Sequence, residues 1–144
     1  MNTNDTNELM QLLAHTTTTS ELKVFDEKLS QDIRQISFSD YINEQIFLQN
    51  ISPADLIAQA GIQRNYGYQI LNGTKNPSKE KIISLCLALH LDVAQTQRAL
   101  KIAQTAPLYP KIRRDAILLF AIQKKYSVQK TNDLLDEMKE EPLQ

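Results

Sequence analysis

Polar side chains suited to specific hydrogen bonding gather in one short segment of the chain, between Gly61 and Gly73. In order, they are Gln63, Arg64, Asn65, Tyr68, Gln69 and Asn72. If the segment is helical, the residues from Arg64 to Asn72 in this set fall on one side of it, because residues three or four positions apart are neighbours on a helix. A guanidinium can donate two hydrogen bonds to guanine, and a carboxamide can pair in the same way with adenine. The simpler interpretation, for an isolated helix, is a solvated polar face.

Two short helices are predicted in this region. Ser52 and Pro53 have the residue types of an N-cap and a first helical position, and Gly61 can adopt the positive φ that follows a helix end. A second helix is expected from Gln63 to about Leu71, closed by Asn72 and Gly73. The tight turn between the two helices would place both in a fixed relation.

Three isoleucines are expected to hold these two helices together. Ile57 lies on the first helix, Ile62 in the turn and Ile70 on the second helix. Their spacing allows all three to meet on the inner side and to set the angle between the helices.

Helical patterns run along the whole sequence, whereas alternation of period two is never sustained, so the predicted fold class is all-α. From the middle of the chain onward, the expected helices cover residues 38–49, 53–60, 63–71, 78–89, 92–103, 111–125 and 127–138. Ser39 or Asp40 is expected to cap the first of them, which has apolar contacts from Tyr41, Ile42, Ile46 and Leu48. Later helices are expected to be capped by Ser78, Asp92 and Ser127. A shorter pair precedes these helices, at residues 7–14 and after Thr18, where Thr18 and Glu21 have capping-box spacing. The second of this pair is expected to carry Leu22, Phe25 and Leu29 on one side. Three regions follow: 1–37, 38–103 and 104–144.

Charge is unevenly distributed, although the 144 residues sum to a net charge of −1. Residues 1–60 carry −6 and residues 131–144 carry −4, whereas residues 61–99 carry +3 and residues 100–130 carry +6. A basic middle is compatible with a surface that faces phosphates. Helical proteins often have uneven charge blocks, so this pattern alone is weak support.

Four marks with consistent spacing point to a known family. They are the turn Ala60-Gly61-Ile62, Gly73 after the second helix, Lys75 and Pro77 in the next loop, and the helix end Ala88-Leu89-His90-Leu91. From about Phe38 to Leu100 the sequence therefore resembles the Cro/repressor-like (Xre-type) helix-turn-helix family. The resemblance implies a lambda-repressor-like bundle of about five helices, with helical extensions before and after it.

The resemblance also implies a function and a set of contacts. Members of this family place the second helix of the motif in the major groove, so helix 63–71 would contact bases through Gln63, Arg64 and Asn65, with Gln69 one turn further on. Asn72 matches a phosphate-contacting position, and Lys75 is a natural second phosphate partner. The implied activity is sequence-specific binding of double-stranded DNA by a transcriptional regulator. A repressor and a homodimer are expected, since the fold commonly binds two half-sites.

Gly67 departs from the family pattern, which usually has a buried aliphatic residue at this position. A glycine inside a helix costs about 1 kcal/mol relative to alanine and is expected to leave a hole in the core. Either Tyr66 or Tyr68 could fill that hole. Tyr68 is therefore either a DNA contact or a core residue, and Tyr66 is more readily a core residue.

The flanking regions carry less specific information. In residues 104–144, the broad apolar face of the segment Lys111–Ile122 predicts packing within the chain, or else a dimer contact. Arg113 and Arg114 either contact phosphates or are simply placed unfavourably at a helix start. The tail, Glu140–Gln144, is expected to be frayed. Residues 1–37 form an acidic extension that could pack on the core, bind a protein or compete with DNA. An antitoxin-like regulator or protein-interaction adaptor is thus the alternative function, and RNA binding is a third.

No enzyme signature is found, and no cofactor or metal is expected. His15 and His90 are isolated, and no Gly-rich phosphate loop is present. Cys86 is the only cysteine and lies on a predicted apolar stripe, which is typical of a core residue in a reducing compartment. The longest apolar run, Ala116–Ile122, is far shorter than the ~20 residues of a membrane span. The expected location is cytoplasmic.

Overall fold

In the computed structural model, the residues whose structure is described are 10–11, 14, 18–24 and 36–144. The chain divides into two units, Met1–Ser37 and Phe38–Gln144. In the described parts of both units, all regular secondary structure is helical, which confirms the predicted all-α class. None of the described helices is both long enough and apolar enough to cross a bilayer.

The first unit contains a short helix that begins after Thr18. The backbone N–H of Glu21 donates to Thr18 Oγ1 at 3.1 Å, and the Thr18 hydroxyl donates to Glu21 Oε1 at 3.1 Å. The predicted cap at Thr18 is therefore present. The predicted helix 7–14 and the apolar positions Phe25 and Leu29 lie wholly or largely outside the described residues.

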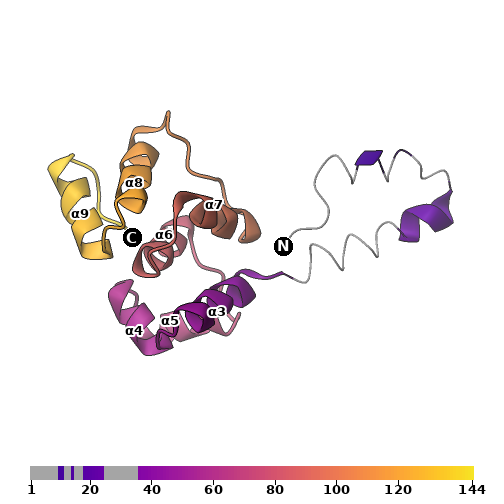
Figure 1. The fold of residues 1–144 in the computed structure, drawn as a ribbon, viewed down its shortest axis with the longest axis horizontal. Coiled ribbons are helices and arrows are strands. Elements are labelled where there is room, and N and C mark those ends of the chain that lie inside the picture. Colours follow the sequence, from indigo (N-terminus) through magenta and orange to yellow (C-terminus); the bar gives the residue numbers. More distant parts are fainter. Residues whose placement is uncertain (1–9, 12–13, 15–17, 25–35) are drawn as a thin grey trace. The chain divides into compact units, whose positions relative to one another are not determined.

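The second unit is a bundle of helices, most of them joined by short turns, with a longer connection between α7 and α8 (Figure 1). Its first five helices are α3 (Phe38–Gln49), α4 (Pro53–Gln59), α5 (Arg64–Leu71), α6 (Lys79–Ala88) and α7 (Val93–Ile102). Two more follow, α8 (Arg113–Gln123) and α9 (Val128–Glu137). These bounds lie within two residues of the predicted ones at each end. Residues 104–144 pack into the same unit as α3–α7.

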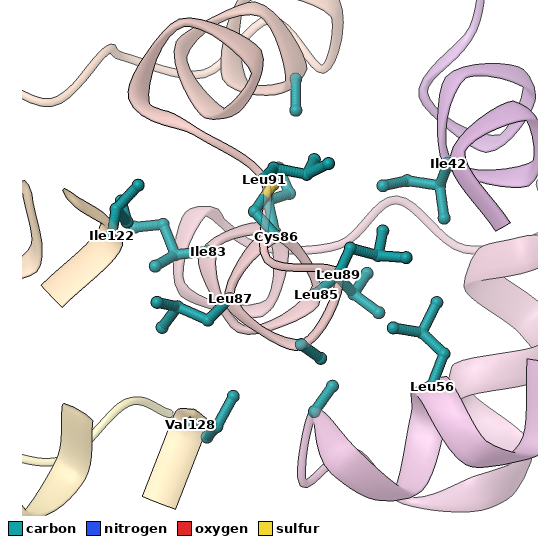
Figure 2. Packing of buried hydrophobic residues seen from close by; sticks show 14 of the residues in the cluster. Ile42, Leu56, Ile83, Leu85, Cys86, Leu87, Leu89, Leu91, Ile122 and Val128 are labelled. Atoms are coloured by element: carbon teal, nitrogen blue, oxygen red, sulfur yellow. The ribbon is translucent and has the colours of Figure 1, made fainter. Parts of the chain in front are cut away.

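Helix α6 lies at the centre of the core. Seven of its ten residues are buried, from Ile82 to Ala88, so it presents apolar atoms in every direction. Figure 2 shows its leucines and isoleucines between Ile42 and Leu56 on one side and Ile122 and Val128 on the other. A short helix buried on all sides can form only if its ends are well capped and its neighbours cover it.

Side-chain caps define most of the helix starts. Ser52, Ser78, Asp92 and Ser127 each accept a hydrogen bond from the backbone N–H three residues later. Asp92 forms a full capping box, because Gln95 Oε1 also accepts from the Asp92 N–H at 3.0 Å. All four caps were predicted from the sequence. Each is worth about 1 kcal/mol to its helix.

Helix α3 differs from its prediction in two details. It begins at Phe38, so Ser39 and Asp40 lie inside its first turn and not at the N-cap position. Leu48 was expected to make apolar contacts, but it is 67% exposed, as is Phe47 at 82%. The buried positions Phe38, Tyr41, Ile42, Gln45 and Ile46 define the inner side of the helix, and Leu48 falls outside that stripe.

The apolar face of α8 is buried against this same unit. Ile117, Leu118, Ala121 and Ile122 are all at most 7% exposed and belong to the common core. Of the two interpretations of this face, packing within the chain is thus the one found. These side chains are not available to a second copy.

Arg113 and Arg114 bind the end of the chain. Arg114 donates to both carboxylate oxygens of Glu80, through Nε at 2.9 Å and through the second terminal nitrogen at 3.0 Å. It also donates to the Glu141 carbonyl at 2.7 Å, while Arg113 pairs with Glu140 at 2.7 Å. The two arginines are therefore engaged within the chain, and their proposed role as phosphate contacts is not supported.

The C-terminal tail is held in place, so the expectation that it is frayed was wrong. The N–H of Leu143 donates to Asn132 Oδ1 at 2.8 Å, and the N–H of Gln144 donates to Glu80 Oε1 at 3.0 Å. Leu143 also packs against the core. The sequence pattern of the tail is polar, and its partners lie on α6 and α9, so no local signal could have indicated this contact.

The buried thiol of Cys86 provides a first prediction. Cys86 is 0% exposed, and burial raises its pKa from the ordinary 9.0 to about 12, because the thiolate would lose its hydration. The native thiol therefore stays protonated where the unfolded thiol ionises. The contribution of Cys86 to the free energy of unfolding is fully present below pH 9 and is lost as the pH rises toward 12.

We expect the free energy of unfolding to fall by about 1.4 kcal/mol between pH 7 and pH 10 through Cys86 alone. Urea unfolding at both pH values gives the change in the free energy of unfolding for the wild-type protein and for Cys86→Ala. The difference between these two changes is the contribution of Cys86. The pKa of Tyr41 is also raised by burial and acts in the same direction, but it is present in both proteins. Identical pH dependences would contradict the prediction.

Candidate nucleic-acid interface

The turn between α4 and α5 is closed by backbone hydrogen bonds that need the conformation of Gly61. The N–H of Gly61 donates to the Ala58 carbonyl at 3.1 Å, and the N–H of Ile62 donates to the Ile57 carbonyl at 3.2 Å. Gly61 has a φ of +70°, which is unfavourable for residues with a Cβ. This pairing satisfies the end of α4 and directs the chain into α5 within three residues.

Ile57, Ile62 and Ile70 are all buried, at 2%, 6% and 1% exposure. This confirms the prediction that the three isoleucines lie on the inner side of the motif. Leu56 and Leu71 are also buried beside them. The two helices are thus fixed to the core by their inner faces, which leaves the opposite side of α5 free to carry polar groups.

Gln63 caps α5. Its Oε1 accepts a hydrogen bond from the N–H of Tyr66 at 2.8 Å, and its backbone has a non-helical conformation. The side chain remains exposed, so its amide N–H groups stay directed to solvent or to a ligand. The sequence placed Gln63 among the base contacts, and the structure adds this capping role.

The other end of α5 is fixed by helix α3 and by a turn. Asn43 of α3 donates from Nδ2 to the Leu71 carbonyl at 2.8 Å. Asn72 Oδ1 accepts from the N–H of Thr74 at 2.9 Å, and Gly73 follows with a φ of +83°. The Asn72 amide nitrogen is left as a donor at an exposed position, which fits the predicted phosphate contact.

Gly67 leaves no hole, so that expectation was wrong. A Cβ built on Gly67 would lie 2.6 Å from Ile57 Cγ2 and 2.7 Å from Ile57 Cγ1. The side chain of Ile57 therefore occupies the space that a side chain at position 67 would need. Glycine at this position lets α4 approach α5 closely, and neither Tyr66 nor Tyr68 is required to fill a gap.

The two tyrosines of α5 have different environments. Tyr66 is partly buried and packs against the core, whereas Tyr68 is 37% exposed. Arg64 lies over the ring of Tyr68, with 5.9 Å from the guanidinium carbon to the ring centre. Such a contact restricts the arginine at the surface. Tyr68 is therefore not a core residue, and its ring is accessible at the surface.

The outer edge of α5 brings together the residues that the sequence singled out. Arg64 and Asn65 are exposed in its first turn, and Gln69 is half-buried one turn later. Asn72 and Lys75 are exposed beyond its C-terminal end. We call the side chains of Arg64, Asn65, Tyr68 and Gln69 the polar edge of α5.

Electrostatics at this edge favour an anionic or hydrogen-bonding partner. Helix α5 contains no acidic residue and carries one cation, Arg64. The carboxylate of Glu80, in the first turn of the next helix, is already paired with Arg114 at 2.9 Å. Lys75 precedes it in the connecting loop and has no ion pair with any residue that the structure describes.

Searches with this chain found no matching family, no matching curated protein and no matching solved structure. Within the described residues, no group of three or more His, Cys, Asp or Glu side chains is placed to hold a metal ion. The proposal below therefore depends on the geometry of α4, α5 and the turn between them.

Proposed function

We propose that the protein is a sequence-specific DNA-binding regulator of the Cro/repressor-like class, with α3–α7 as its five-helix DNA-binding unit. Helix α5 enters the major groove and its polar edge contacts base edges. Asn72 and Lys75 contact phosphates. The regulator is a repressor that binds its operator as a homodimer.

The outward direction of the polar edge is the observation that carries this proposal. A helix of eight residues is joined to α4 by the four residues 60–63, and its inner face is fixed by Ile70, Leu71 and the close contact of Gly67 with Ile57. What remains outside is a row of Arg, Asn and Gln side chains. These are the residue types that form bidentate hydrogen bonds with guanine and adenine in the major groove.

Rigid support strengthens the proposal, because base recognition needs side chains held in a fixed position. Gln63 caps the N-terminal end of α5, Asn43 binds its C-terminal end, and the core holds its inner side. The cap from Gln63 is local, whereas the bond from Asn43 comes from α3, 28 residues earlier in the sequence, and ties the end of α5 to the bundle.

Selection from a pool of random DNA duplexes at low salt tests the function. We expect enrichment of one motif, composed of two related half-sites in inverted orientation, since a two-fold dimer binds a palindromic site. Affinity for the enriched duplex should fall steeply as salt rises, because phosphate contacts release counterions. A pool that remains random after repeated rounds would refute sequence-specific binding.

A further inference from the structure

A second surface of the protein combines exposed cations with two aromatic rings, one exposed and one partly buried. It lies where α8 ends and α9 begins, and we call it the lysine–aromatic patch. Its members are Phe120, Lys124, Tyr126 and Lys130. The sequence indicated a basic block over residues 100–130 but not where its charges gather.

The two rings of the patch pack edge to face. Phe120 and Tyr126 have ring centres 6.0 Å apart and an interplanar angle of 83°. Phe120 is 43% exposed, and Tyr126 is partly buried. The Lys124 ammonium lies 5.6 Å from the centre of the Phe120 ring, and the Lys130 ammonium lies 4.4 Å from that of Tyr126. The rings therefore hold two ammonium groups at the surface in defined positions.

These two lysines differ from the paired cations near the start of α8. Arg113 and Arg114 are paired with glutamates, and Lys79 lies 3.8 Å from Asp115. In contrast, no carboxylate among the described residues comes within ion-pair distance of Lys124 or Lys130. Their charges are thus free to meet an external anion.

The patch is positioned beside the turn of the proposed helix-turn-helix. Lys125, between the two lysines in sequence, donates from Nζ to the His90 carbonyl at 2.8 Å and so fixes the α8–α9 turn to the end of α6. A groove of about 550 Å³ is lined by Ala58 and Gly61 of the turn region and by Ser127, Gln129 and the acidic Asp133 of the α9 region. Helix α5 begins three residues after Gly61. The start of α9, which adjoins Tyr126 and Lys130 of the patch, therefore lies across this groove from the turn that precedes α5.

We propose that the lysine–aromatic patch binds the sugar-phosphate backbone of the same duplex, flanking the base pairs contacted by α5. This inference rests on the proposed function. Two fixed ammonium groups match phosphates, and the ring edges can pack against sugars. An acidic protein segment could satisfy the lysines as well, but the start of α9 lies across a groove from the turn that precedes α5, so a duplex bound by α5 would bring its phosphates to this side of the molecule, which favours the nucleic acid.

The test compares Lys124→Gln/Lys130→Gln with Lys101→Gln/Lys111→Gln. The control removes the same charge from exposed lysines outside the patch. Both variants are first shown by circular dichroism to be folded. Binding to the enriched duplex and to a scrambled duplex of equal length is then measured by fluorescence anisotropy between 50 and 300 mM salt.

The patch variant is expected to lower the slope of log affinity against log salt by about 2, for both duplexes, because each lost phosphate contact removes about 0.9. The control should leave both slopes unchanged. If the wild-type protein selects a motif but the patch variant keeps its slopes, the patch proposal is overturned and the proposed function stands. If no motif is selected but the slope for random DNA still falls by about 2, the patch proposal holds and sequence-specific recognition fails. Binding of polyglutamate through the patch, with unchanged DNA slopes, would instead assign the surface to a protein.

Discussion

Arg64→Ala is expected to weaken binding to the selected operator by about 5- to 150-fold, because one good base contact is worth about 1–3 kcal/mol. The loss should be confined to the operator, so that affinity for a scrambled duplex changes far less. Since Arg64 is exposed and contacts only the ring of Tyr68 among the described interactions, the free energy of unfolding should stay within about 0.5 kcal/mol of wild type. Fluorescence anisotropy with both duplexes and urea unfolding measure the two effects.

Lys75→Ala is the matched control for this prediction. Lys75 is also exposed and also cationic, but it lies in the loop after α5. Its loss should weaken binding to both duplexes by the same factor and lower the salt slope by about 1. If Arg64→Ala behaves as Lys75→Ala does, Arg64 is a phosphate contact and the base-contacting role assigned to it is wrong.

Gly67→Ala is expected to destabilise the protein by about 1–3 kcal/mol, which is opposite to the direction that helix propensity gives. Alanine inside a helix is favoured over glycine by about 1 kcal/mol, yet its methyl group would lie 2.6–2.9 Å from three carbons of Ile57. Ile57 is β-branched and 2% exposed, so it cannot turn away at low cost. Urea unfolding measures the change.

A double-mutant cycle with Ile57 tests the cause. Ile57→Ala removes all three carbons that the new methyl group would meet, whereas Ile57→Val removes only Cδ1 and keeps the two closest carbons. We therefore expect Ile57→Ala to cost several kcal/mol less in the Gly67→Ala background than in the wild type, and Ile57→Val to show little such coupling. Additive effects for both pairs would show that the close approach of α4 and α5 is not what position 67 determines.

The helix order of the second unit could be predicted because its signals are local. Ser52, Ser78, Asp92 and Ser127 each bond to a backbone group only three residues away, so the sequence alone indicates where those helices start. The same holds for Gly61, whose positive φ is needed by the turn itself. The candidate site was found in the same way, because the helical repeat places Arg64, Asn65, Tyr68 and Gln69 together once α5 is assumed.

The features that could not be predicted depend on contacts between distant residues. Ile57 fills the space beside Gly67 only because α4 and α5 cross closely at that point. Arg114 bonds to Glu80 and to the tail, which are 34 and 27 residues away, so its position at a helix start gave no indication of its partners. Leu48 was assigned to the core from its residue type, but the side of α3 that packs is determined by the helices it meets. The lysine–aromatic patch was missed for the same reason, since Phe120 and Tyr126 meet only once α8 has ended.

The most direct test of the central claim combines the removal of one side chain with the modification of one base. In the selected operator, a guanine whose preference is lost in Arg64→Ala is replaced by 7-deazaguanine, which lacks the N7 acceptor in the major groove but keeps normal pairing. Affinity is measured for both proteins on both duplexes. If Arg64 of α5 contacts that base, the modified base will weaken the wild-type protein and have little further effect on Arg64→Ala, so the two losses will not add. Equal losses in both proteins would show that the outer edge of α5 does not contact the base, and the proposed mode of recognition would be wrong.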